Sequence, residues 1–229
     1  MDRKKFLKRG VLGIGTLAFI PTAVTSCSDD DDSNTGSSSD CELSPRETEG
    51  PFPIKSPSEL VLSNIVSDRS GVAMVINIQV VDNDTNCEPI EGVFVDIWHC
   101  DADGNYSEYG NTQMQQTDYT DKHFLRGRQT TDASGNVSFV SIYPGWYRGR
   151  APHIHVEVLD SNENSLMVTQ IAFPEDTSSG VYATTGYNGE PDTSNTSDNV
   201  FSDSLANNMA DSITGNTTDG FVLTKVITV

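Results

Sequence analysis

Short runs of valine, isoleucine and phenylalanine, separated by turn-forming residues, constrain the fold of this chain most strongly. β-Branched and aromatic residues favour strands, and clusters of Gly, Asn, Asp and Pro between them favour turns. Five stretches have this composition: 71–82 (GVAMVINIQVVD), 92–100 (GVFVDIWHC), 151–160 (APHIHVEVLD), 165–173 (SLMVTQIAF) and 221–229 (FVLTKVITV). We expect an all-β fold, a β-sandwich of two packed mixed sheets with long irregular loops.

Local patterns add detail to this expectation. The sequence DASGN at 132–136 is turn chemistry between two strand-like runs, so we predict a hairpin there. The stretches 151–160 and 165–173 are predicted to pair around the turn SNEN. Residues 176–220 are rich in Asp, Asn, Ser, Thr and Gly and are expected to be irregular. Only 200–213 has a spacing that fits a helix.

The first 26 residues have the composition of an export signal. Five basic residues lie within positions 3–9, the apolar run VLGIGTLAFI follows, and small residues precede Cys27. The sequence VTSC resembles a lipobox, which predicts a lipid on Cys27; the alternative is ordinary cleavage after Ser26 with Cys27 free. We expect an exported lipoprotein that faces the periplasm or the cell surface, with Cys27 as its only membrane attachment.

Residues 27–44 form the predicted tether, because acids in a Ser, Asn and Gly background cannot bury enough apolar surface to fold. The acidic run also resembles the surface-export signal of some Gram-negative lipoproteins, and a solvated linker is the alternative. Residues 45–229 are long enough for one domain with its own core.

Charge and cysteine content limit the partners and the crosslinks. A formal net charge of −19 argues against a nucleic-acid partner.

Export makes a disulfide possible. Besides Cys27 the chain has Cys41, Cys87 and Cys100, and the last two are expected to bracket a strand that holds them too far apart to bond. A bridge from Cys41 to either of them is the remaining possibility.

Two histidines and two tyrosines are the candidate metal ligands. In a strand, His153 and His155 leave the same face, since their positions differ by two. Tyr106 and Tyr147 each lie in a turn close to a strand. Each of these residues alone is most often structural. Together the two tyrosines and two histidines suit a hard trivalent ion. Tyrosinate is a known iron ligand, whereas zinc and calcium sites seldom contain tyrosine.

Long ordered motifs then show a resemblance. The segments VFVDIWHCDADGNYSEYG, FLRGRQTTDASGNVSFVSIYPGWYRGRAPHIHVEV and TEGPF (48–52) resemble the intradiol ring-cleavage dioxygenases, above all their secreted branch. The resemblance covers most of 41–229 and is strongest from 92 to 173. It implies a catechol-type substrate, O2 and a muconate-type diacid product.

The same resemblance implies a non-haem Fe(III) cofactor and a role for each site residue. Tyr106 and His155 would be equatorial ligands, and Tyr147 and His153 axial ones, with Tyr147 also acting as a base. Arg150 and Gln170 complete the implied catalytic set, Arg150 as the residue that stabilises negative charge on the ring. The segment from Tyr147 to Arg150 is much shorter than in the characterised cytoplasmic enzymes, so the resemblance says little about the substituents of the substrate.

Three other polar residues are interpreted as lying outside the metal site, and two alternative functions fit the same residues. We interpret His99 as a packing residue beside the ligands, His123 as a surface residue, and Arg148 as a solvated rim residue that could instead meet an anionic substituent. The alternative functions are an exported binding module with a degenerate iron site, and an iron protein that binds aromatics or catecholates without cleaving them. The oligomeric state does not follow from the sequence.

Overall fold

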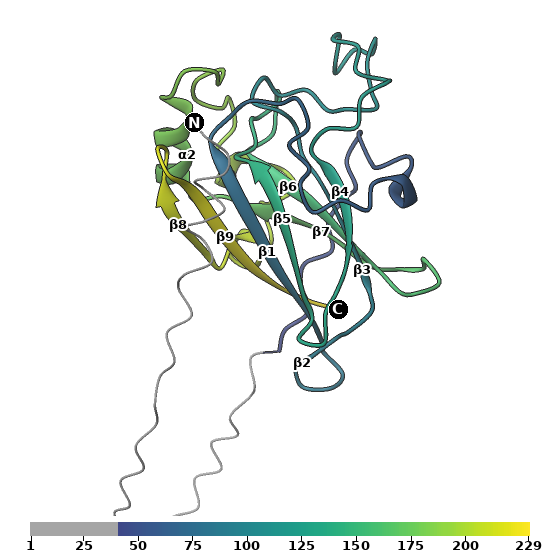
Figure 1. Cartoon of the computed structure of the whole chain (residues 1–229). Helices are drawn as coiled ribbons and strands as arrows, with labels where there is room; N and C mark the ends of the chain where they lie inside the picture. The colour runs from purple at the N-terminus through teal and green to yellow at the C-terminus, as the bar shows by residue number, and fades with distance from the viewer. Residues whose placement is uncertain (1–40) are drawn as a thin grey trace, which may run out of the picture. The chain divides into compact units, whose positions relative to one another are not determined.

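The structure, a computed structural model, describes residues 41–229, and two β-sheets stacked as layers are the framework of this part of the chain (Figure 1). The expected export signal, the lipidated Cys27 and most of the tether lie outside the described residues. The first sheet contains β1 (Ala73–Asp82), β2 (Glu88–Pro89), β5 (Asn136–Ile142), β8 (Ser212–Asn216) and β9 (Gly220–Thr228). The second contains β3 (Phe94–Trp98), β4 (Arg126–Thr130), β6 (His153–Leu159) and β7 (Ser165–Ala172). The expected β-sandwich is therefore confirmed.

The strand order differs between the two sheets. The first sheet runs β2-β1-β9-β8, with β5 also paired to β1. Strands β1 and β9 are parallel and all other pairs in this sheet are antiparallel, so the sheet is mixed. The second sheet runs β4-β3-β6-β7 and is antiparallel throughout, rather than mixed as expected. The predicted pairing of 151–160 with 165–173 is present as β6 and β7, and 221–229 contributes β9.

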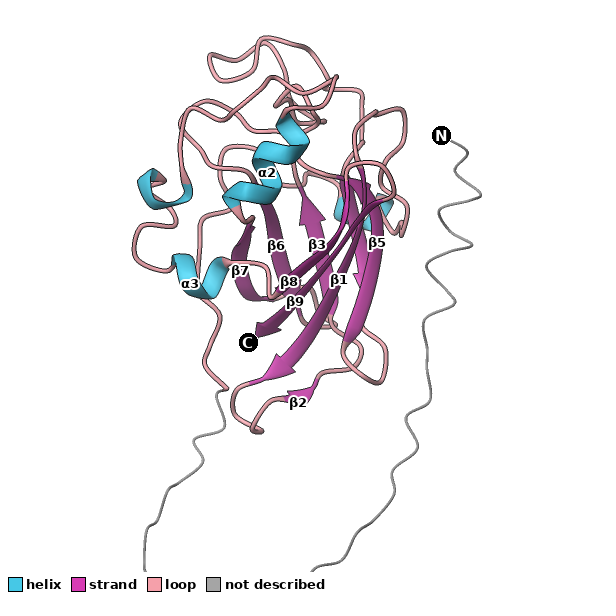
Figure 2. Cartoon of the chain, turned by 90° about the vertical axis from the view of Figure 1, so that its left-hand side faces the viewer, coloured by secondary structure: helices cyan, strands magenta, loops and turns pink. Residues whose placement is uncertain are grey.

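The core lies between the sheets and follows the alternation of the strands. Ile76, Ile78 and Val80 of β1 and Ile154 and Val156 of β6 are all buried in one apolar cluster. Since neighbouring side chains of a strand point to opposite faces, the histidines that flank Ile154 leave β6 on the outer face of the second sheet. That face is covered by loops, because both histidines are also buried. Long loops gather at one end of the sandwich in both views (Figures 1 and 2).

The predicted hairpin at 132–136 is wrong. The turn forms, with Oδ1 of Asp132 accepting hydrogen bonds from the backbone N–H groups of Ser134 and Asn136. However, β4 pairs with β3 while β5 pairs with β1, so the turn carries the chain from one sheet to the other. The same turn residues can join two strands of one hairpin or two strands of different sheets. Which strands pair depends on the faces that each strand buries, and the turn sequence does not report this.

Two helices, a 3-10 turn and strand β8 lie wholly or mostly inside the region expected to be irregular. Helix α2 (Glu175–Tyr182) follows β7 directly, with Glu175 and Asp176 in its first turn, where acidic side chains stabilise a helix. Strand β8 pairs with β9. Within 200–213, the helical part is α3 (Leu205–Asn208), which is four residues long. The remaining short elements are the 3-10 turns η1 (Pro57–Glu59) and η2 (Asn195–Ser197).

A disulfide joins Cys41 to Cys87. The predicted participation of Cys41 is confirmed, and its partner is the cysteine that precedes β2. Cys100 is free and buried. Within residues 41–229, no helix has the length and apolar character needed to cross a bilayer.

Candidate metal centre

Two close neighbours confine the ring of His155 in β6. The ring of His155 stacks on the indole of Trp98 in β3, with centroids 4.9 Å apart and an interplanar angle of 2°. The backbone of Gly50 also lies close to this ring: Gly50 has φ +68, and a Cβ atom there would lie only 2.9 Å from Cε1 of His155. Glycine is therefore required in TEGPF, because it tolerates this φ and allows the backbone to approach the ring.

The two tyrosines come from loops that meet over this face. Tyr106 follows the turn DADGN, where Oδ1 of Asp101 accepts the N–H groups of Asp103 and Asn105. Its backbone N–H donates to Oε1 of Gln115 at 2.7 Å, and its side chain is fully buried. Tyr147 follows the Pro-Gly-Trp segment after β5 and is only partly buried.

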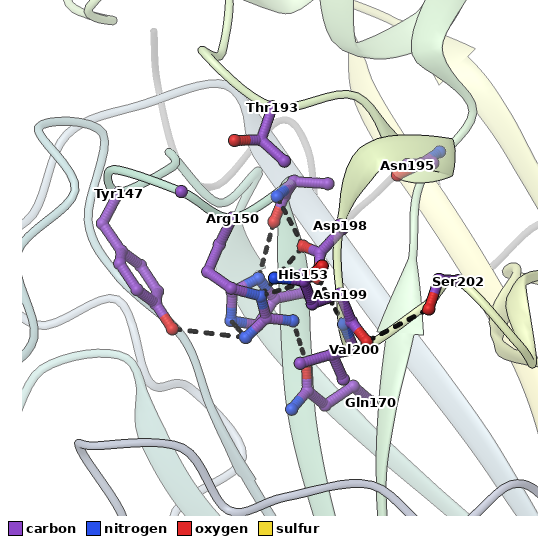
Figure 3. Close-up of polar contacts among 12 residues, drawn as sticks. Tyr147, Arg150, His153, Gln170, Thr193, Asn195, Asp198, Asn199, Val200 and Ser202 are labelled. Atoms are coloured by element: carbon purple, nitrogen blue, oxygen red, sulfur yellow. Dashed lines mark hydrogen bonds and ion pairs between the residues drawn. The ribbon is translucent and has the colours of Figure 1, made fainter.

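Donor atoms of three of these residues converge. Nε2 of His153 lies 3.1 Å from Nε2 of His155 and 3.4 Å from the hydroxyl of Tyr106. The hydroxyl of Tyr147 lies 3.3 Å from Nη1 of Arg150, which is itself 3.4 Å from Nε2 of His153 (Figure 3). All four predicted ligands therefore belong to one cluster, and Arg150 lies inside it.

The hydrogen bonds and the burial set the protonation of the cluster. Nδ1 of His153 lies 2.6 Å from the carbonyl oxygen of Ala151, so the ring proton is on Nδ1 and Nε2 is a bare acceptor. Burial lowers the pKa of His153 and of His155 well below the usual value, and the nearby positive charge of Arg150 acts in the same direction. Burial also raises the pKa of Tyr106 and of Tyr147. Without a metal the site holds neutral imidazoles and neutral phenols.

This donor set fits a metal ion of the kind that the sequence predicts. Two nitrogen ligands at right angles, each about 2.1 Å from a transition metal, lie about 3.0 Å apart. The two Nε2 atoms are 3.1 Å apart, close to that separation, and the Nε2 of His153 carries a lone pair rather than a proton. Among the described residues no group of three His, Cys, Asp or Glu side chains could hold a metal. A centre here therefore depends on the tyrosines, and phenolate oxygen favours a hard trivalent ion.

The predicted Arg150 and Gln170 lie next to each other. Gln170 of β7 is directly opposite His155 in the sheet register, and its Oε1 accepts Nη2 of Arg150 at 2.6 Å. Nε of Arg150 donates to the carboxylate of Asp198 at 2.9 Å. Sequence reasoning missed Asp198, because it lies among many other polar residues in a segment without periodicity.

The three remaining polar residues lie as expected. His99 is fully buried, with Nδ1 2.8 Å from the carbonyl oxygen of Cys100 and Nε2 2.7 Å from Oγ of Ser141, so it packs without contacting the donor cluster. The side chain of His123 is 49% exposed. Arg148 is exposed at the rim.

Comparisons with known proteins agree with this arrangement. The family model described as Dioxygenase matches residues 53–179, a range that contains all six predicted site residues. Two solved structures share the fold. An intradiol ring-cleavage dioxygenase from Tetranychus urticae is 31% identical with a TM-score of 0.72, covering 82% of this chain and 94% of that chain. The dioxygenase domain of a carbohydrate-binding fusion protein from Streptomyces sp. SirexAA-E is 26% identical with a TM-score of 0.59, covering 82% and 98%.

Two curated relatives match over a shorter range. Chlorocatechol 1,2-dioxygenase from Rhodococcus opacus is 30% identical over 112 residues, which is 41% of each chain. The protocatechuate 3,4-dioxygenase beta chain from Burkholderia cepacia is 32% identical over 115 residues, or 46% of each chain. The chain thus spans less than half the length of the curated relatives that it matches. The fold and the matched motifs define a dioxygenase of the β-sandwich type, and the chain belongs to the intradiol ring-cleavage dioxygenase family. That family uses non-haem iron.

Proposed function

We propose that this protein is a non-haem Fe(III)-dependent intradiol dioxygenase that acts on a catechol-type aromatic. Both atoms of O2 enter the substrate, and the ring opens between the two hydroxyl-bearing carbons to give a muconate-type diacid. The observation that carries this proposal is a single cluster of two imidazoles and two phenols, in which the donor atoms of His153, His155 and Tyr106 converge and Arg150 links them to Tyr147.

Tyr106, Tyr147, His153 and His155 are the proposed ligands. Two phenolates and two neutral imidazoles leave one net positive charge on a ferric ion. The two phenol protons must leave when the ion binds, so ion binding strengthens as the pH rises. The bound ion would supply a site for the two catechol oxygens and draw electron density from the ring, which prepares it for O2.

The surroundings of the two tyrosines give them different roles. Tyr106 is fully buried and stacked on Phe52, with centroids 4.6 Å apart, so it is held in place. Tyr147 is partly exposed, and its hydroxyl has one hydrogen bond, from Arg150. Tyr147 is therefore the ligand that can leave and accept a proton from a catechol hydroxyl.

Arg150 is the proposed group that stabilises charge. Nη1 of Arg150 donates to Nε2 of His153 at 3.4 Å. A His153 that bound an ion through Nε2 would have no lone pair left for that bond, and Nη1, still pointing in the same direction, would then be available to the negative charge that builds up on the substrate ring. Removing a donor of this kind typically costs about 2.7–4 kcal/mol of transition-state stabilisation. Gln170 supports Arg150 through its hydrogen bond to Nη2.

We also propose that the protein is exported and anchored by a lipid on Cys27. The basic and apolar N-terminal segment and the lipobox-like VTSC support this placement. The disulfide between Cys41 and Cys87 supports it independently, since structural disulfides persist in oxidising compartments. Detergent extraction of cells that express the wild-type chain or Cys27→Ser tests the anchor. The wild-type chain should need detergent to leave the membrane fraction, and Cys27→Ser should not. If the wild-type chain also leaves the membrane fraction without detergent, the proposed lipid anchor is wrong.

Colour, oxygen uptake and product analysis test the enzyme proposal. The full chain loaded with Fe(III) should be red-brown from tyrosinate-to-iron charge transfer. Tyr106→Phe should lose or shift this band. Tyr109→Phe is the matched control, because Tyr109 packs on the same Phe52 but donates its hydroxyl to the backbone of Pro53.

A panel of catechols in an oxygen electrode, with 18O2, then separates the alternatives. The enzyme consumes one O2 for each catechol and yields a diacid that carries both labelled atoms. A coloured protein that binds catechols and consumes no oxygen is a binder, and a colourless one is a module without iron. Either result refutes the proposed activity.

A further inference from the structure

A polar segment beyond the family match braces the short loop that carries Tyr147 and Arg150. Nε1 of Trp146 donates to the carbonyl oxygen of Gly189 at 2.8 Å. The backbone N–H of Gly149 donates to Oδ1 of Asp192 at 2.9 Å. These two bonds fix the start and the middle of the loop, at Trp146 and Gly149.

The end of the loop is held by Asp198, which follows η2 and is fully buried. Its carboxylate accepts the backbone N–H of Ala151 at 2.7 Å through Oδ2 and that of Val200 at 2.9 Å through Oδ1. Both oxygens also lie within 3.0 Å of Nε of Arg150. A fully buried carboxylate is costly unless it is paired and hydrogen-bonded, and Arg150 supplies the pairing charge.

Each nitrogen of the Arg150 guanidinium has its own partner. Nε faces Asp198, and Nη2 donates to Oε1 of Gln170 at 2.6 Å. Only Nη1 is left to face the donor cluster, where it meets the hydroxyl of Tyr147 and Nε2 of His153 (Figure 3). Since the guanidinium is planar, fixing two of its nitrogens sets the direction of the third.

We propose that Asp198 is a positioning residue for the reaction: it holds the Arg150 guanidinium so that Nη1 points at Tyr147 and the substrate. This inference rests on the proposed function. The hydrogen-bond partners of the Asp198 carboxylate within residues 41–229 are Arg150, Ala151 and Val200, so Asp198 acts on the site through Arg150. The competing interpretation is that Asp198 only braces the backbone at Ala151 and Val200.

Hydrogen exchange of the Arg150 side chain tests the contact without iron or substrate. The Nε–H signal of Arg150 in the metal-free full-length chain is identified in NMR spectra by its absence from Arg150→Lys. We expect its exchange in Asp198→Asn to be about tenfold faster or more, because the accepting carboxylate is gone. Asp192→Asn is the matched control, since Asp192 caps the same loop without touching Arg150, and it should leave the Nε–H exchange unchanged. Equal acceleration in both variants overturns the proposal. Should Asp198→Asn fail to fold, Asp198→Ser takes its place, because serine keeps an acceptor for the backbone.

Kinetic measurements on the iron-loaded protein test whether Asp198 positions Arg150 for the reaction. A displaced catalytic group can cost about 100-fold in rate, so we expect Asp198→Asn to lower kcat by about 10- to 100-fold with little change in KM. In an Arg150→Lys background the same substitution should have no further effect on kcat. Independent, additive losses would show that Asp198 only braces the loop. If the wild-type chain consumes no catechol, the proposed function fails, and the exchange measurement alone decides whether Asp198 positions Arg150.

Discussion

The buried His99 predicts a specific loss of stability in acid. Its ring has no exposed surface, Nδ1–H donates to the carbonyl of Cys100, and Nε2 accepts from the hydroxyl of Ser141. Burial lowers the pKa of His99 to about 4, against an ordinary value of 6.5, and the charge of Arg126 adds to the effect. Between pH 4 and pH 6.5, His99 therefore binds a proton in the unfolded chain but stays neutral in the folded chain.

The sign and the size follow from linkage. A base whose pKa is depressed by folding stabilises the protein fully above its unfolded pKa, and this contribution is lost as the pH falls toward the folded pKa. For His99, the free energy of unfolding should fall by about 2.5 kcal/mol between pH 7.5 and pH 4.5. His153 and His155 have lowered pKa values as well, so the total loss in the metal-free chain is larger.

His99→Gln isolates this contribution, because glutamine does not titrate and keeps a polar group near Ser141. Urea unfolding of the metal-free full-length chain is followed by tryptophan fluorescence at several pH values from 4.5 to 7.5. The difference in unfolding free energy between wild type and variant should change by about 2.5 kcal/mol over this range, in favour of the variant at low pH. Parallel pH profiles for the two proteins would refute the argument that burial depresses the pKa of His99.

Two further predictions concern the disulfide and a turn. Replacing Cys41 and Cys87 together by serine removes a crosslink that spans 46 residues, and the loop-entropy relation gives a loss of about 4 kcal/mol in the free energy of unfolding. Urea titration measures it, and a loss below about 1 kcal/mol would contradict the expected constraint on the unfolded chain. Gly104→Ala should cost about 2 kcal/mol or more, since Gly104 has φ +85 and a Cβ atom would overlap the backbone of the loop before Tyr147. Gly149→Ala is its control, with φ +82 but open space around a Cβ, and should cost only about 1 kcal/mol; equal losses would mean that the contact is unimportant.

The site was predictable where its residues follow a strand or a long motif. The spacing of His153 and His155 places both on one face of a strand whatever surrounds it, and β6 has that form. Tyr106 and Tyr147 were found because each lies in a distinctive motif next to a turn. Asp198 was not, because its neighbours are equally polar and only contacts with a distant loop distinguish it.

The parts of the fold that escaped prediction depend on distant partners. The residues of β4 and β5 have strand composition and a turn between them, but nothing local says that they enter different sheets. Helix α2 contains serine, threonine and glycine, which are weak helix formers, and it packs through Val181 and Tyr182. Tertiary contacts stabilise such a short helix, and its own sequence predicts it poorly.

The parallel pairing of β1 with β9 has a consequence for the order of folding. Strand β9 lies between β1 and β8, so the first sheet has a gap in its centre until residues Gly220–Thr228 are in place. Contacts between the first long strand and the last one are slow to form, because the entropy of closing the intervening loop must be overcome first. The first sheet therefore cannot be completed before β9 has been synthesised. We expect a truncation before Gly220 to leave the edges of β1 and β8 unpaired and prone to aggregation, even though every predicted ligand is still present.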